Sequence, residues 1–357
     1  MAALREQAEK AAVWTLPRLP RPLLRAIGGR PVRIDGQELD PQVQVALRLE
    51  RIVGGDRVLP VEEKRAQRRR DARVFSGPLI EVERTEELEI PGPDGPIAAR
   101  LYVPGALTSS APLIVYFHGG GHVIGDLDTH DQPCRFLASE VPALLLAVDY
   151  RLGPEHRFPA AVDDAFAAFR WAHEHASNLG ADPERIAVIG DSAGGNLAAV
   201  ICQLARDAGG PAPALQVLLY PVIDYSAKRR SYHLFGEGFF LTRTEMDWYR
   251  DNYLSSDADR SDPRASPILA SDLSGLPPAH IVTCGFDPLR DDGEDYAQAL
   301  RDAGVEVTLR REPGLVHGFL NAVGLGGPAR EAADGVVEAL RAWVKAGERS
   351  DSRAGAH

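Results

Sequence analysis

The sequence lacks several features that would place it in other classes of protein. It has only three cysteines, Cys134, Cys202 and Cys284, which lie far apart in apolar surroundings and show no spacing typical of disulfide or metal sites. No apolar run approaches the length of a membrane-spanning helix. The opening residues, MAALREQAEK, contain no apolar segment of a secretion signal. We therefore expect reduced cysteines, no stable membrane insertion and a cytoplasmic location.

An excess of positive charge is also missing. The 357 residues carry a net charge of -11, which argues against nucleic acid as a partner. With 44% hydrophobic and 25% charged residues, the chain has a globular composition that allows one large core with an accessory segment, or two cores. The basic run from Lys64 to Arg73 is accordingly interpreted as a solvated helix face.

Strand and helix patterns alternate through most of the chain. After two strand patterns on either side of the turn PGPDGP, apolar runs and helix-like spacings follow one another. The strand patterns cover 113–117, 143–150, 186–189, 215–220, 279–284 and 305–310, and the helix patterns cover 159–176, 197–208, 292–303 and 328–344. This order predicts an α/β fold with a mostly parallel central sheet flanked by helices, and a ligand site at the carboxyl ends of the strands.

Three segments stand apart from this alternation. Residues 1–85 have short helical patterns broken by prolines, and we expect them to lie over the main domain, 86–346, as a helical cap segment. An amphipathic membrane contact near Leu23 to Ile27 is disfavoured, because the stretch is short and broken by prolines. The insertion at about 224–267 is rich in aromatic residues, so it either packs a core of its own or lines a pocket. Residues 347–357 have the composition of a disordered tail.

The most informative stretch is Ile186 to Asn196, IAVIGDSAGGN, in which a strand pattern runs into G-x-S-x-G and a helix pattern follows. In that setting the serine, Ser192, sits on a sharp turn that holds its hydroxyl above the sheet, and the N–H of Ala193 points to where negative charge would collect. A glycine-rich turn without chemistry is the alternative, in a chain with 34 glycines. The flanking strand and helix favour Ser192 as a nucleophile.

A serine nucleophile needs a base and a group that orients the base. Among ten histidines, His317 is the best placed, directly after a strand pattern, and Asp287 follows the preceding strand pattern. A loop histidine and a helix N-cap are the alternative roles, and Asp291 and Asp292 remain alternatives to Asp287, which is nearest the strand end. The order serine, aspartate, histidine is that of the α/β-hydrolase fold.

Two further clusters bear on the chemistry. His118-Gly119-Gly120-Gly121 follows a strand pattern, and its glycines leave backbone N–H groups open to an oxyanion, each worth about 3 to 4 kcal/mol of barrier. Asp128, His130 and Asp131 resemble metal ligands, but without a further histidine or cysteine at ligand spacing we interpret them as solvated loop residues. We therefore expect no metal and no cofactor.

These motifs together resemble the hormone-sensitive lipase family of α/β-hydrolases, which includes the bacterial family IV esterases. The motifs that carry the resemblance are YFHGGGHVIGD (116–126), DYRLGPEHRFPA (149–160), GDSAGGN (190–196), DPLRDD (287–292) and HGF (317–319).

The resemblance implies a carboxylesterase or lipase-like serine hydrolase. It implies Ser192 as nucleophile, Asp287 and His317 as its partners, a cap made of the N-terminal region and the insertion, and small-molecule substrates that are short- to medium-chain esters. The oxyanion hole would comprise Gly119, Gly120, Gly121 and Ala193, with Gly119 shaping the loop, and the expected pocket residues are His122, Phe239, Phe240 and Trp248. The chain departs from the family's usual residues at His122, Gly153 and Asp292.

Two other activities fit the same fold. An amidase or formamidase would use the same triad, and a non-catalytic ligand-binding protein would have the fold without the catalytic histidine. His317 is present here, which disfavours the second alternative. The strand pattern 305–310 could lie at a sheet edge and pair in a homodimer.

Overall fold

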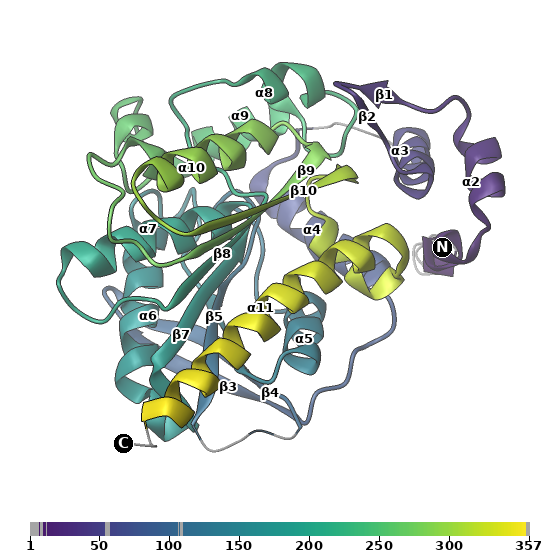
Figure 1. The fold of residues 1–357 in the computed structure, drawn as a ribbon. Coiled ribbons are helices and arrows are strands. Elements are labelled where there is room, and N and C mark those ends of the chain that lie inside the picture. The colour runs from purple at the N-terminus through teal and green to yellow at the C-terminus, as the bar shows by residue number, and fades with distance from the viewer. Residues whose placement is uncertain are drawn as a thin grey trace.

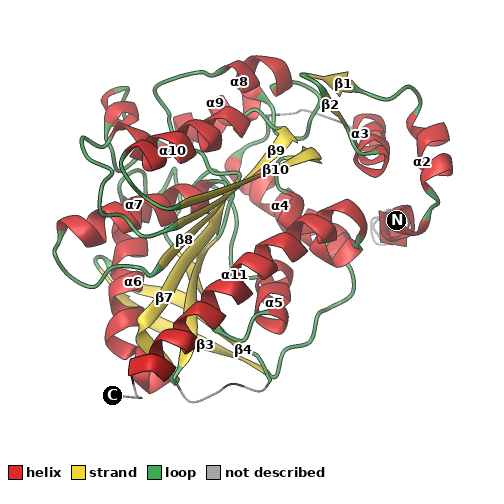
Figure 2. Ribbon diagram, viewed as in Figure 1, coloured by secondary structure: helices red, strands yellow, loops and turns green. Residues whose placement is uncertain are grey.

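An eight-stranded sheet forms the centre of the molecule (Figures 1 and 2). The computed structural model describes residues 7, 10–11, 13–53, 58–105, 107 and 110–354. The strand order is β10-β9-β8-β7-β5-β6-β4-β3, and the strands from β10 to β6 are parallel, whereas β4 and β3 are added by antiparallel pairing. The strands are β3 (Arg84–Gly92), β4 (Gly95–Val103), β5 (Ala111–Phe117), β6 (Leu144–Asp149), β7 (Ala181–Asp191), β8 (Leu215–Leu219), β9 (Ala279–Phe286) and β10 (Val307–Val316).

Helices cover both faces of the sheet, and each face has its own hydrophobic core (Figure 1). Every residue of β5 and of β9 is buried, because these strands lie between two helical layers. A parallel sheet covered in this way explains the continuous apolar runs of the sequence. One face carries α6 (Ala160–Leu179), α7 (Ala193–Asp207) and α10 (Arg290–Asp302), and the other carries α5 (Asp131–Glu140), η4 (Phe319–Leu325) and α11 (Gly327–Ala354).

A cap of two chain segments lies over the carboxyl ends of the strands (Figure 1). The segments meet where Lys64 Nζ donates to Glu245 Oε1 at 2.7 Å and Arg51 donates to the carbonyl of Gly238 at 3.1 Å. The N-terminal segment comprises η1 (Leu16–Arg18), α2 (Arg21–Gly28), β1 (Arg33–Ile34), β2 (Gln37–Glu38), α3 (Pro41–Val53) and α4 (Val61–Phe75). The insertion comprises α8 (Arg230–Phe235), α9 (Arg243–Tyr253), η2 (Ala258–Ser261) and η3 (Pro267–Leu269).

The α/β architecture and the mostly parallel sheet are confirmed, but several boundaries are wrong, among them the start of β7, which lies at Ala181 and not at Ile186. The strand expected at 305–310 begins at Val307 and continues to Val316, because its later residues pair with β9 beyond the apolar pattern. The tail expected to be disordered from residue 347 is helical to Ala354, as the end of α11, and 355–357 lie outside the described residues. In the part of the chain that the structure describes, no helix is long and apolar enough to cross a membrane.

Candidate active site

Ser192 occupies the sharp turn between β7 and α7. Its backbone has φ 55° and ψ -114°, which is strained for a residue with a side chain. A Cβ on Gly190 would lie 2.2 Å from the carbonyl carbon of Gly194, and one on Gly194 would lie 1.8 Å from the carbonyl oxygen of Phe117. Only glycine fits at these two positions, so the G-x-S-x-G pattern follows from the close approach of helix, strand and neighbouring strand.

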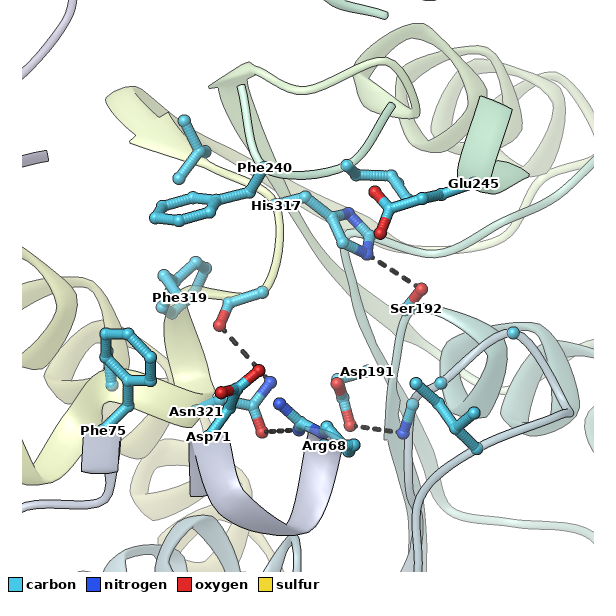
Figure 3. A pocket seen from close by; sticks show the side chains of 18 of the residues that line it. Arg68, Asp71, Phe75, Asp191, Ser192, Phe240, Glu245, His317, Phe319 and Asn321 are labelled. Atoms are coloured by element: carbon cyan, nitrogen blue, oxygen red, sulfur yellow. Dashed lines mark hydrogen bonds between the residues drawn. The ribbon is translucent and has the colours of Figure 1, made fainter. Parts of the chain in front are cut away.

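The three side chains expected to act together do meet at the carboxyl edge of the sheet. His317 Nε2 lies 2.9 Å from Ser192 Oγ, and His317 Nδ1 lies 2.8 Å from Asp287 Oδ2. Asp287 is fully buried, and the ring of Tyr220 packs edge-on against the imidazole at 4.8 Å between centroids. Figure 3 shows the side chains of Ser192 and His317 pointing towards each other, joined by their hydrogen bond, in the wall of the cavity. The hydroxyl, imidazole and carboxylate therefore form one continuous hydrogen-bonded chain.

The other acidic residues near the end of β9 are directed elsewhere. Asp291 accepts the N–H of Ser231 at 2.7 Å, and Asp292 accepts the backbone N–H groups of Ile223 and Asp224, where the insertion begins. Burial raises the pKa of Asp292 to about 7, against the opposing effect of a nearby arginine. Asp287 also accepts the N–H of Leu289 at 2.8 Å, so it helps to begin α10 as well as contacting His317.

The glycine loop after β5 supplies free backbone donors beside Ser192. Among the described residues, the N–H groups of Gly120, Gly121 and Ala193 have no hydrogen-bond acceptor. Gly119 differs, because its N–H donates to Asp191 Oδ1 at 2.8 Å. Gly119 therefore shapes the loop, as expected, and its N–H is not free to bind an oxyanion.

Asp191 anchors this loop, a function that the sequence analysis missed. Its Oδ1 accepts the N–H of Gly119 and, at 2.6 Å, the hydroxyl of Tyr116, and the side chain is almost fully buried. His130 Nε2 lies 3.8 Å from the same oxygen. The available signal was the position of Asp191 directly before the serine, where a short buried carboxylate can reach the neighbouring loop.

His130 is buried, and the expectation of a solvated loop residue is wrong. Burial lowers the pKa of His130 well below its usual value, with a smaller effect of the Arg68 guanidinium, so the ring is neutral. Arg68 Nη2 lies 3.2 Å from His130 Nε2 and donates to Asn321 Oδ1 at 2.6 Å. Through Arg68, helix α4 of the cap thus contacts His130, which lies beside Asp191, and Asn321, which lies in the segment after His317.

The basic run from Lys64 to Arg73 is only in part a solvated face. Lys64, Arg68 and Asp71 line the cavity above the serine, because one side of α4 faces the strand ends. Burial raises the pKa of Asp71, partly offset by neighbouring basic residues. A single sequence gives no signal that separates such a helix from a solvated one, since the pattern of charges is the same.

No metal site emerges from the acidic residues near His130. Asp128 and Asp131 both accept hydrogen bonds from Arg100, at 2.9 and 3.2 Å. Within the described ranges, no group of three or more histidine, cysteine, aspartate or glutamate side chains could hold a metal ion.

A cavity of about 1070 Å³ lies between the cap and Ser192. Of the four expected pocket residues, Phe240 lines it, and the other three do not. Phe239 packs against Phe286 in the small core under the cap, Trp248 packs on the main core, and His122 is fully buried behind the glycine loop. The side chains labelled around the cavity in Figure 3 are Arg68, Asp71, Phe75, Asp191, Ser192, Phe240, Glu245, His317, Phe319 and Asn321.

The aromatic residues of the insertion have both of the expected roles, because some line the cavity and others pack in cores. Tyr225, Tyr232, Phe240 and Tyr249 line the cavity, and a Cβ on Gly121 would lie 2.3 Å from the ring of Tyr249. The remaining aromatic side chains of the insertion pack in cores.

His122 is a buried, neutral histidine that should make the protein sensitive to acid. Its ring stacks on Tyr253 at 3.9 Å between centroids, and Nδ1 lies 3.2 Å from the hydroxyl of Tyr225. Burial lowers the pKa of His122 from 6.5 to about 3. The unfolded chain thus binds this proton more tightly than the folded protein, and stability is lost as the pH falls from 6.5 towards 3.

His122→Phe should reduce this loss while keeping the stacked ring. Urea unfolding between pH 6 and pH 4 should show a free energy of unfolding that falls less steeply in the variant, by about 1.4 kcal/mol per pH unit. At neutral pH the variant should be about 1 kcal/mol less stable, because Tyr225 loses its partner. If the free energy of unfolding fell equally steeply with pH in the wild type and in the variant, His122 would have to take up its proton in the folded state as readily as in the unfolded chain.

Comparisons with known proteins agree with this geometry. A family model described as the alpha/beta hydrolase fold matches residues 114–321. The chain is 52% identical over 342 residues to the carboxylic ester hydrolase LipN of Mycobacterium tuberculosis, covering 93% of this chain and 90% of that protein. It is 41% identical over 292 residues to ethyl acetate hydrolase of Pseudomonas putida, covering 79% and 90%.

A solved esterase structure is also similar to this chain in fold and sequence. The hyperthermophilic esterase from the archaeon Pyrobaculum calidifontis superposes with a TM-score of 0.82 at 39% identity, covering 85% of this chain and 98% of that one. Fold, site and sequence similarity thus agree. The chain belongs to the α/β-hydrolase family, among the hormone-sensitive lipase-like esterases, and is a serine ester hydrolase.

Proposed function

We propose that Ser192, His317 and Asp287 hydrolyse carboxylic esters through an acyl-enzyme. Ser192 Oγ attacks the ester carbonyl while His317 Nε2 takes its proton, and His317 then gives the proton to the leaving alcohol. A water molecule that His317 deprotonates attacks the acyl-enzyme and releases the acid. Asp287, buried and bonded to Nδ1, holds the imidazole in the required tautomer. The observation that carries the proposal is the chain of contacts at 2.9 and 2.8 Å.

The free N–H groups of Gly120, Gly121 and Ala193 would hold the oxyanion of the tetrahedral intermediate. Gly120 has φ +119°, and a Cβ there would lie 2.1 Å from the carbonyl oxygen of Ile124. Gly120→Ala should therefore displace the loop and lower kcat by about 10²- to 10³-fold, with a smaller change in KM. Steady-state kinetics with p-nitrophenyl butyrate and a melting curve of the folded variant check this.

Gly210→Ala is the matched control, because a Cβ there would meet nothing within 4 Å. It should have wild-type kinetics. Unchanged kcat in a folded Gly120→Ala variant would remove Gly120 from the oxyanion hole.

The walls of the cavity favour esters of short- to medium-chain acids. Apolar side chains such as Phe240 and Phe319 offer contact to the first methylene groups, each worth about 0.8 kcal/mol when buried. The same wall also carries Lys64, Glu245 and Arg68, against which a longer apolar chain would have to desolvate charged groups. With p-nitrophenyl butyrate, octanoate and palmitate, kcat/KM should be high for the first two and fall for palmitate. A maximum at palmitate would contradict this range.

The same triad could cleave amides, so matched substrates are needed. Butyryl p-nitroanilide has the same acyl group as the ester, and we expect it to be hydrolysed far more slowly, because its amide is less reactive. Equal or faster cleavage of the anilide would favour an amidase. Absence of turnover on both, with ligand still bound, would favour a binding protein.

A cytoplasmic location and a homodimer remain proposals. All three cysteines are buried free thiols, which is compatible with a reducing compartment. Strand β10 is the outermost strand on one side of the sheet, so it could pair with a second copy. Fractionation of the source cells and the mass of the protein in solution test these two proposals, and a monomeric mass would contradict the dimer.

A further inference from the structure

Helix α2 presents an apolar face to solvent. Pro22, Leu23, Ala26 and Ile27 are all exposed, Leu23 by 45% and Ile27 by 44%, and at 100° per residue they share one side of the helix. The opposite side holds Leu24, which is buried. A helix on the surface of a globular protein usually has its apolar side inward and its polar side in water, so α2 has an apolar surface without a partner among the described residues.

The orientation of α2 is fixed by its contacts with α3. Leu24 packs with Leu16 and Val45 in a small core. Gln44 Nε2 donates to the carbonyl of Gly28 at 2.7 Å, and Arg48 donates to the carbonyl of Ile27 at 2.6 Å. These contacts hold the helix so that Leu23 and Ile27 point outward, and Figure 1 shows α2 at the periphery of the molecule, on the far side of α3 from the sheet.

The same segment is strongly basic in an otherwise acidic protein. Residues 11–34 contain five arginines and no aspartate or glutamate, whereas the whole chain carries a net charge of -11. Arg21 and Arg33 pair with carboxylates, but Arg18, Arg25 and Arg30 are exposed and have no carboxylate within 4 Å among the described residues. Unpaired positive charge and exposed apolar surface therefore lie on the same segment of the cap, with Arg25 on a different side of α2 from Leu23 and Ile27.

Against the expectation from the sequence alone, we propose that this face of α2 docks on a bilayer that contains anionic lipids. Leu23 and Ile27 would enter the boundary between headgroups and acyl chains, and the arginines would pair with lipid phosphates. A two-fold dimer through the same face would bring the arginines of two copies together, so like-charge repulsion disfavours a second copy as the occupant. The contact is peripheral and spans no membrane.

The docking face is also close to the cavity. Leu16, which packs with Leu24, lines the cavity itself, as do Ala46 and Leu49 on the side of α3 that faces it. Docking through α2 would thus bring the cap, and not the opposite end of the sheet, to the bilayer. An apolar ester dissolved in the lipid would then be held near the cap, which forms part of the cavity wall.

Co-sedimentation of the full chain with vesicles tests the proposal. We expect the protein to bind vesicles of phosphatidylcholine and phosphatidylglycerol at least about tenfold more tightly than vesicles of phosphatidylcholine alone, and to dissociate as salt is raised. Leu23→Ser combined with Ile27→Ser, and separately Arg18→Gln combined with Arg25→Gln, should each weaken binding by about tenfold or more.

The controls remove similar side chains from other surfaces. Leu79 and Leu269 are 59% and 40% exposed, so the pair Leu79→Ser and Leu269→Ser should bind vesicles like the wild type, as should Arg84→Gln with Arg170→Gln. All variants should hydrolyse p-nitrophenyl butyrate at the wild-type rate, which separates a failure of docking from a failure of the esterase.

Three results would overturn the proposal. The first is absence of binding to the anionic vesicles, and the second is binding that the α2 substitutions do not change. The third is a dimeric mass in solution that Leu23→Ser and Ile27→Ser convert to a monomer, which would assign the face to a second copy of the chain.

Discussion

Ser192→Ala is expected to lower kcat/KM for p-nitrophenyl butyrate by at least about 10⁴-fold. The hydroxyl is the atom that forms the acyl bond, and no other nucleophile in the described part of the chain lies within hydrogen-bonding reach of His317 Nε2. Alanine fits the turn no worse than serine, because both carry a Cβ at the same positive φ. The variant should therefore fold normally.

The melting temperature of Ser192→Ala separates loss of chemistry from loss of structure. It should lie close to that of the wild type, since among the described residues the hydroxyl forms a hydrogen bond only with the imidazole. Hydrolysis at the wild-type rate by the folded variant would mean that Ser192 is not the nucleophile.

Asp287→Asn should lower kcat by about 10⁴-fold with little change in KM. The amide that replaces the carboxylate can turn its N–H₂ towards Nδ1, which would favour the tautomer with the proton on Nε2. His317 could then no longer accept the proton of Ser192. The loss of a buried charge that bonds both His317 and Leu289 also removes the stabilisation of the imidazolium that forms during the reaction.

Asp291→Asn is the matched control for Asp287→Asn. The two residues lie near the start of the same helix, but Asp291 bonds Ser231 and Arg290 and has no contact with His317. Its substitution should change kcat only slightly. A similar loss in both variants would indicate that Asp287 acts through the fold of this segment and not through the histidine.

The parts of the site that the sequence could predict are those that a local pattern fixes. The turn at Ser192 can be recognised in the sequence because Gly190 and Gly194 have no room for a side chain, so the turn requires the pattern G-x-S-x-G. His317 and Asp287 could be selected because parallel strands end at the same edge of the sheet, so side chains just beyond two strand patterns lie near each other.

The parts that escaped prediction depend on packing between distant segments. Arg68 belongs to a basic run that looks solvated, and only the placement of α4 over the strand ends turns it towards His130 and Asn321. Phe239 and Phe240 are adjacent in the sequence, but Phe239 is buried in the small core, whereas Phe240 packs against that core and also lines the cavity. The backbone turns at Phe240, where φ is 62°. A sequence pattern does not specify which of two such neighbours faces a ligand.

Reaction with an organophosphate tests the central claim most directly, because it needs a nucleophilic serine and its base in one place. Diethyl p-nitrophenyl phosphate should release one equivalent of p-nitrophenolate and leave a diethylphosphoryl group on the peptide that contains Ser192. The same treatment of His317→Ala should give almost no label. A label on another peptide, or equal labelling of the His317→Ala protein, would contradict the account.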